Sequence, residues 1–184
     1  MALEIDAALS GLNSNSYVTL AEAESYFAAR LHAASWISAA NDSKAQALIT
    51  ACRHIESCRL RVDRQVSTMF SPARSDQVLS FPRLRDVNAL GAYIVPPRVC
   101  DAQCEEALVL LAFGAEQERR AALQAGGVTS FSTDGLSEGY GAGAPSHPVA
   151  GAQARILLGP YIERGGVIAT SDVAVGEFTP ASGR

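Results

Sequence analysis

Residues 96–127 have the sequence PPRVCDAQCEEALVLLAFGAEQERRAALQAGG, which predicts one long helix from about Arg98 to Gln124. Pro97 suits the first turn of a helix, because its missing N–H would have no intrahelical partner there. The glycine pair at 126–127 ends the helix. In the middle of the run apolar side chains cover much of the circumference, which indicates burial on several sides. We therefore expect a mainly α-helical fold, a small bundle around this central helix.

An earlier helix is predicted to begin at Thr19. Glu22 follows three residues later, the spacing of a capping box, in which each residue accepts a hydrogen bond from the backbone of the other. Apolar residues at helical spacing continue to about Leu31. Trp36 follows in a predicted loop, where its ring would pack against the core.

Two further helices are predicted from residues that typically begin or end a helix. Asn41-Asp42-Ser43 offers favourable N-cap side chains, and the apolar stripe that follows runs to about Leu60. A short helix is expected from about Val149 to Leu158, where Gly159-Pro160 ends it.

The other segments lack a helical pattern. We expect an extended N-terminal arm over residues 1–16, a long loop over 61–96 that covers the bundle or meets a neighbour, and a C-terminal docking tail over 165–184. Asp134-Gly135 is a typical hairpin turn, so a short β-hairpin is predicted from about 128 to 140 within a hairpin and linker region at 126–147. The helical domain itself would span residues 17–164.

The charge of the chain argues against a protein that grips nucleic acid over its whole surface. The formal net charge is −4 and Lys44 is the single lysine. A strand-binding groove needs a basic track and exposed stacking rings, whereas the aromatic residues here fall on helix faces. The densest basic stretch contains Arg53, Arg59, Arg61 and Arg64. Both a phosphate contact and a solvated or interface face remain open for it.

Membrane and disulfide classes are not indicated either. No stretch reaches the roughly 20 apolar residues of a membrane span, and residues 1–16 lack the pattern of a signal peptide. The spacing of the four cysteines does not match a zinc site, so we expect small buried hydrophobic residues in a reducing compartment; they are Cys52, Cys58, Cys100 and Cys104.

We find no catalytic motif and expect neither an enzyme nor a bound cofactor or metal. The sequence has no phosphate-binding loop, nucleophile elbow or zinc-protease motif. The three histidines, His32, His54 and His147, are far apart and are expected at the surface or in loops. Glu105 and Glu106 are adjacent, and neighbours on a helix do not face one another, so they predict a charged face.

Five landmarks strung over residues 15–162 resemble a family of small tailed-phage proteins encoded near the portal and major capsid genes. They are Asn15-Ser16-Tyr17-Val18 followed by Ala23 and Tyr26-Phe27, the run 47–53 after Trp36, Phe81-Pro82-Arg83 where relatives often have Trp-Pro-Arg, Val95-Pro96 with Val99, Ala102 and Glu105, and Leu157-Leu158-Gly159-Pro160-Tyr161. Relatives are labelled in two ways: head–tail connector, head completion or adaptor proteins, and DnaT-like single-stranded-DNA-binding proteins.

The connector label implies a structural virion protein of the head–tail junction, made in the host cytoplasm. Twelve copies would form a ring between the portal protein and the tail or its terminator or nozzle protein, with packaged DNA passing through the lumen without specific binding. Such a ring needs head-to-tail contacts that close. Docking by strand addition would use the tail or the hairpin, and the candidate residues are Val167, Ile168, Val173, Val175, Phe178, Phe131, Leu136 and Tyr140.

The second label implies a single-stranded DNA-binding replication accessory protein. We keep this function as the alternative to the connector, with Arg53, Arg59, Arg61 and Arg64 as the candidate DNA contacts.

Overall fold

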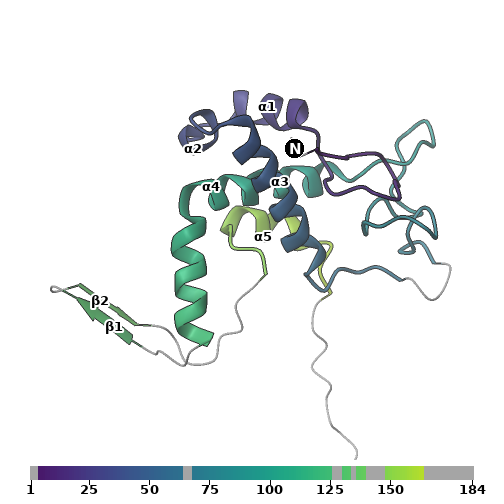
Figure 1. The fold of residues 1–184 in the computed structure, drawn as a ribbon. Coiled ribbons are helices and arrows are strands. Elements are labelled where there is room, and N and C mark those ends of the chain that lie inside the picture. The colour runs from purple at the N-terminus through teal and green to yellow at the C-terminus, as the bar shows by residue number, and fades with distance from the viewer. Residues whose placement is uncertain (1–3, 64–67, 126–129, 134–135, 140–147, 164–184) are drawn as a thin grey trace, which may run out of the picture.

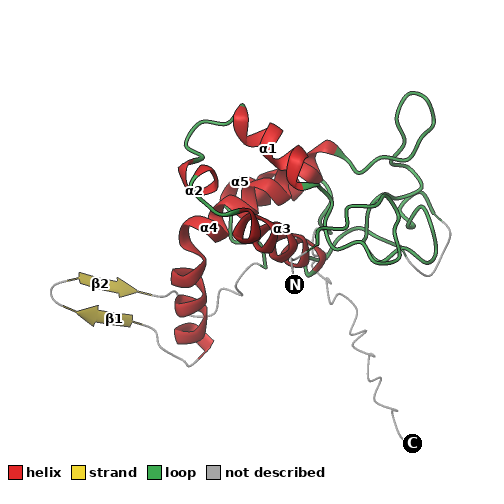
Figure 2. Ribbon diagram, turned by 45° about the horizontal axis from the view of Figure 1, so that its top comes forward, coloured by secondary structure: helices red, strands yellow, loops and turns green. Residues whose placement is uncertain are grey.

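The computed structural model describes residues 4–63, 68–125, 130–133, 136–139 and 148–163. Its fold is mainly helical, as the sequence predicts (Figures 1 and 2). The helices are α1 (Leu20–Ala28), α2 (Ala34–Ile37), α3 (Asn41–Glu56), α4 (Pro97–Ala125) and α5 (Ala152–Leu158), and the strands are β1 (Ser130–Thr133) and β2 (Leu136–Gly139).

The long helix α4 lies at the centre of the packing. α1, α2, α3 and α5 all contact it, and α3 and α5 do so most extensively. Its first half is buried on several sides, with Val99, Ala102 and Ala107 fully enclosed. The small side chains at these positions allow the neighbouring helices to approach closely. The predicted central helix is therefore confirmed, with a start one residue earlier, at Pro97.

The second half of α4 turns away from the core in both views (Figures 1 and 2), and Leu108 is the last of its residues with described side chains to be buried. The strands β1 and β2 stand apart on the same side, paired antiparallel from Ser130 with Gly139 to Thr133 with Leu136. They fall within the predicted hairpin region. The turn at Asp134-Gly135 and the end at Tyr140 lie outside the described residues.

α1 begins as the sequence predicts. Thr19 is its N-cap, and both hydrogen bonds of the capping box with Glu22 are present. The helix ends at Ala28 rather than near Leu31. Trp36, expected in a loop, lies in the short helix α2, fully buried, and its ring stacks on Phe27 with centroids 4.3 Å apart.

The predicted N-cap of α3 was wrong, whereas the predicted end of α5 at Gly159 is confirmed. Asn41, Asp42 and Ser43 lie inside the first turn of α3, whose N-cap is Ala40 and makes no side-chain hydrogen bond. α3 also ends at Glu56, four residues before the predicted end. α5 begins at Ala152, after the N-cap Gly151, which has no side chain to cap the helix.

The predicted charged face at Glu105 and Glu106 was wrong as well, because both residues are buried. Glu106 accepts hydrogen bonds from Nδ1 of His54 at 2.8 Å and from the backbone N–H groups of Ala150 and Gly151 at 2.9 and 2.7 Å. It thus binds the amide of the N-cap of α5, Gly151, and the amide of the residue before it. Glu105 binds Arg30, two residues after the end of α1, through both carboxylate oxygens.

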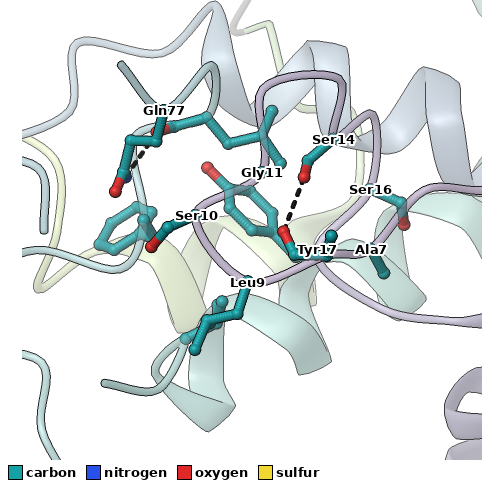
Figure 3. A pocket seen from close by; sticks show the side chains of 12 residues that line it. Ala7, Leu9, Ser10, Gly11, Ser14, Ser16, Tyr17 and Gln77 are labelled. Carbon is teal, nitrogen blue, oxygen red and sulfur yellow. Dashed lines mark hydrogen bonds between the residues drawn. The ribbon is translucent and has the colours of Figure 1, made fainter. Parts of the chain in front are cut away.

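The N-terminal segment differs from the predicted extended arm, since residues 4–18 fold into a closed loop. Asn15 is tied back to Glu4 and Asp6 by side-chain and backbone hydrogen bonds. The loop closes over residues 77–81 around a cavity of about 10 Å³, into which Tyr17 and Gln77 point (Figure 3). This volume is at the lower limit for one water molecule, so the cavity is a packing defect and not a ligand site.

The segment between α3 and α4 is the long predicted loop, and it gathers on the opposite side of the molecule from β1 and β2 (Figures 1 and 2). Buried side chains of this loop join the helical core. Phe81 is 2% exposed and contacts the rings of Tyr17 and Tyr161 edge to face. Glu56 at the end of α3 accepts hydrogen bonds from the backbone and hydroxyl of Ser80. The loop is therefore a packed part of the domain.

Candidate nucleic-acid interface

The charge of this chain is unevenly distributed. Residues 59–98 contain seven arginines and three aspartates, a net charge of +4, whereas the remaining residues contain eight basic and sixteen acidic residues, a net charge of −8. The two parts add up to the −4 of the whole chain. The acidic average, from which we argued against nucleic-acid binding, therefore conceals one basic segment.

A ribbon of backbone hydrogen bonds gives this segment its shape. The stretches 69–73 and 82–85 run antiparallel, with bonds from Leu84 N to Ser71 O at 2.8 Å and from Arg85 N to Met69 O at 3.1 Å. The amide of Ala73 donates to Pro82 O at 2.9 Å. This pairing places Phe70 close to the arginines of the second stretch.

Arg83 fixes the ribbon to the core. Its side chain is 3% exposed and forms a two-pronged ion pair with Asp86, with N–O distances of 2.9 and 3.1 Å. A further bond runs to the carbonyl of Arg61. The guanidinium also lies over the rings of Phe81 and Tyr161, at 4.6 and 5.2 Å from their centroids.

Arg61 and Arg85 lie on the same aromatic ring and are exposed to solvent. Their guanidinium carbons are 4.8 and 5.2 Å from the centroid of Phe70. Neither side chain makes a hydrogen bond or an ion pair with another residue that the structure describes. Such cation–π contacts orient a guanidinium without neutralising its charge.

The C-terminal end of α5 holds this region from the other side. Arg61 N donates to Tyr161 O at 2.8 Å, and Glu163 N donates to Arg59 O at 2.8 Å. Burial raises the pKa of Tyr161, and the nearby charges of Arg85 and Arg98 oppose that rise. We call the exposed arginines of this region the arginine surface; they are Arg59, Arg61, Arg85 and Arg98.

An open hollow of about 550 Å³ adjoins the arginine surface. It is lined by Arg61, Gly159, Pro160, Ile162 and Glu163. Arg59 and Glu163 form a loose ion pair at 3.6 Å, with 80% and 49% of their side chains exposed. Exposed pairs of this kind contribute little to stability, so Arg59 can exchange this partner for another anion.

The structure brings together only part of the predicted DNA contacts. Arg59 and Arg61 belong to the arginine surface, whereas Arg53 lies exposed on α3 in a separate groove with Asn15 and Val78. Arg64 lies outside the described residues. The sequence interpretation missed Arg85 and Phe70. The signal was present in the Phe81-Pro82-Arg83 landmark, but pairing with the stretch 69–73 cannot be read from local spacing.

The predicted docking residues are scarcely described. Val167, Ile168, Val173, Val175, Phe178 and Tyr140 lie outside the described residues, and Phe131 and Leu136 belong to β1 and β2. The docking hypothesis for the tail and hairpin therefore stays a prediction.

Metal sites and membrane spans are two other classes of feature to consider among the described residues. Within them, no three histidine, cysteine or acidic side chains are grouped so as to hold a metal ion. None of the helices in the described part of the chain is long and apolar enough to cross a membrane. All four cysteines have free thiols, and three are buried, with Cys100 partly so, which agrees with the sequence prediction.

The fold and site define a small helical protein with a basic, arginine-rich surface carried by a long packed loop. The family model described as "Putative DnaT-like ssDNA binding protein" matches residues 1–173, nearly the whole chain. The protein belongs to that family. No curated protein and no solved structure gives a significant match.

Proposed function

We propose that this protein binds single-stranded DNA through the arginine surface. The observation that carries the proposal is the concentration of positive charge in residues 59–98 of an otherwise acidic chain. Nucleic-acid affinity comes largely from basic groups that displace counterions from phosphates, and it depends on local charge rather than on the net charge of the protein. The description of the family supports the same ligand.

The chemistry of the exposed side chains supports the proposal. Arginine presents a planar fork of donors that matches a phosphate and remains charged at any physiological pH. Arg61 and Arg85 are held in place by Phe70. Binding of a phosphate should then cost less side-chain conformational entropy than it would for an arginine with no such contact.

A mobility-shift titration with a fluorescent thymidine homopolymer of about ten nucleotides or more, the range bound by single-strand domains, tests the proposal. We expect binding at low ionic strength and a linear fall of log K with log salt concentration. Weaker binding to a duplex of equal length would favour the single strand. If the chain neither shifts nor retains the strand at low salt, the proposal is wrong.

A second candidate function is the head–tail connector subunit. It is supported by the parts that extend from the core: the second half of α4, where Phe113 is 61% exposed, and the two-stranded β1–β2 unit. A two-stranded sheet is marginal in water by itself and leaves both edges open to another strand. In this function the protein would form a ring of twelve copies, as the resemblance implies.

Light scattering and negative-stain imaging of the protein, alone and mixed with its portal, test the connector. A ring, or a portal complex that is lost when residues 165–184 are deleted, would favour it. A monomer that does not bind the portal but is retained on single-stranded DNA would contradict the connector function and support the DNA-binding function.

A further inference from the structure

Within the basic segment, the structure separates a scaffold arginine, Arg83, from the two exposed arginines that lie near Phe70. Arg83 is 3% exposed, and three of its five N–H donors bind Asp86 and the carbonyl of Arg61. Its charge is thus compensated inside the protein, and its burial keeps it from a ligand on the surface. Its role is to hold the ribbon against Phe81 and Tyr161.

The charges of Arg61 and Arg85 are uncompensated. Their guanidinium carbons lie 4.8 and 5.2 Å from the centroid of Phe70, so they are at most about 10 Å apart, and like charges at such a separation repel. Two acidic residues of the segment have other partners: Asp86 binds Arg83, and Asp63 accepts from the hydroxyl of Thr68 at 3.4 Å. Phosphates bound beside Phe70 would offset both charges, and they would meet donors that the ring already orients.

The geometry points to a phosphate-binding site formed by Arg61 and Arg85 on the platform of Phe70, and we infer that it takes the phosphodiester backbone of a nucleic-acid strand. This inference rests on the proposed function and names its central contact. The hollow lined by Gly159, Pro160 and Ile162 lies beside Arg61 and gives the strand room to pass.

The same geometry implies that the site does not distinguish bases. Single-strand binders commonly stack bases on exposed aromatic rings. Here the guanidiniums of Arg61, Arg85 and the buried Arg83 lie 4.8, 5.2 and 5.7 Å from the centroid of Phe70 and compete with a base for its faces. The site therefore recognises phosphates and makes no base-specific contact, so homopolymers of different bases should bind with similar affinity.

The test compares three proteins. The double variant Arg61→Gln/Arg85→Gln removes both charges but keeps polar side chains of similar length. Arg74→Gln is the matched control, because Arg74 belongs to the same loop, is 61% exposed, and has its own partner in Asp76. Circular dichroism and thermal melting first establish that each variant is folded like the wild type. Thymidine and adenosine homopolymers and free tripolyphosphate are the probes.

We expect the double variant to bind both homopolymers about tenfold or more weakly. In a plot of log K against log salt concentration, the slope for the double variant should be shallower by about 1.4. Two phosphate contacts are lost, and each contributes about 0.7 for a single strand. Arg74→Gln should match the wild type. Tripolyphosphate should shift the NMR signals of the Arg61 and Arg85 side chains and compete with the strand.

The outcomes separate the site from the function. Strand binding that is equal in the double variant and the wild type would overturn the site and leave the function standing. Tripolyphosphate binding that depends on Arg61 and Arg85, without strand binding by the wild type, would support the site and overturn the function. A strong preference for one homopolymer would contradict backbone recognition.

Discussion

The carboxylate of Glu106 lies 2.8 Å from Nδ1 of His54, at the point where α3, α4 and the start of α5 meet. The glutamate is 0% exposed and also accepts the amides of Ala150 and Gly151. It therefore joins three elements through one side chain. Tyr161 follows α5, and its carbonyl accepts a hydrogen bond from the amide of Arg61, so this junction supports the arginine surface.

Replacement of Glu106 by glutamine should lower the free energy of unfolding by about 2–3 kcal/mol. A glutamine has one acceptor in place of two and would turn a donor toward the amides at the start of α5. Urea denaturation measures the effect. Glu116→Gln is the control on the same helix, since Glu116 is 58% exposed, and equal stability of the two variants would contradict the assigned role.

Stability should also depend on pH through Glu106. Burial favours the neutral acid, but hydrogen bonds from His54 and two backbone amides outweigh it and hold the pKa below its ordinary value. A carboxylate whose pKa is lower in the folded state stabilises the fold above the pKa of the unfolded chain, and this contribution is lost as pH falls through the folded pKa. The stability difference between wild type and Glu106→Gln should thus be full near neutral pH and shrink below about pH 4. A difference that stays constant down to pH 3 would refute this linkage.

Substitution of Asp86 by asparagine should destabilise the protein by about 3 kcal/mol, because it leaves the buried guanidinium of Arg83 without a charged partner. We expect the loop to become sensitive to limited chymotrypsin digestion at Phe70 and Phe81. Asp76→Asn is the control in the same loop, where the ion pair with Arg74 is exposed and its loss should not change the melting temperature. Equal digestion of both variants would show that Arg83 does not hold the loop.

The native thiols should react slowly with a disulfide reagent at pH 8. Burial raises the pKa of Cys52 and of Cys100 to about 12, and it raises the pKa of Cys58 and Cys104 too. Only the thiolate is nucleophilic, so all four cysteines should react only as fast as the protein opens, and rapidly in denaturant. Stoichiometric labelling of the native protein within the mixing time would argue against this packing.

Local sequence patterns determined where most helices lie. The capping box at Thr19 and Glu22 and the entry at Pro97 depend on residues a few positions apart, and the structure has both. The N-cap of α3 was predicted wrongly, since Ala40 occupies that position. The start of α5 has no local signal, because Gly151 offers no side chain and its amide binds Glu106, which lies 45 residues earlier in the chain.

The site depended on contacts of a different kind. From the composition we predicted an acidic chain, and from the adjacent positions of Glu105 and Glu106 we predicted a charged face. Both predictions fell short because the sequence alone does not show which charged side chains have buried partners. Only the tertiary structure pairs Glu105 with Arg30 and Arg83 with Asp86.

By itself, then, the sequence determined the helical class, the central helix and the burial of the cysteines, since periodicity and small apolar side chains act locally. The tertiary structure alone decided which arginines remain free. Arg61 and Arg85 are 24 positions apart, and they meet on Phe70 because backbone hydrogen bonds join the stretches 69–73 and 82–85. That pairing depends on the packing of Phe81 and Arg83 against the core, and no local pattern encodes it.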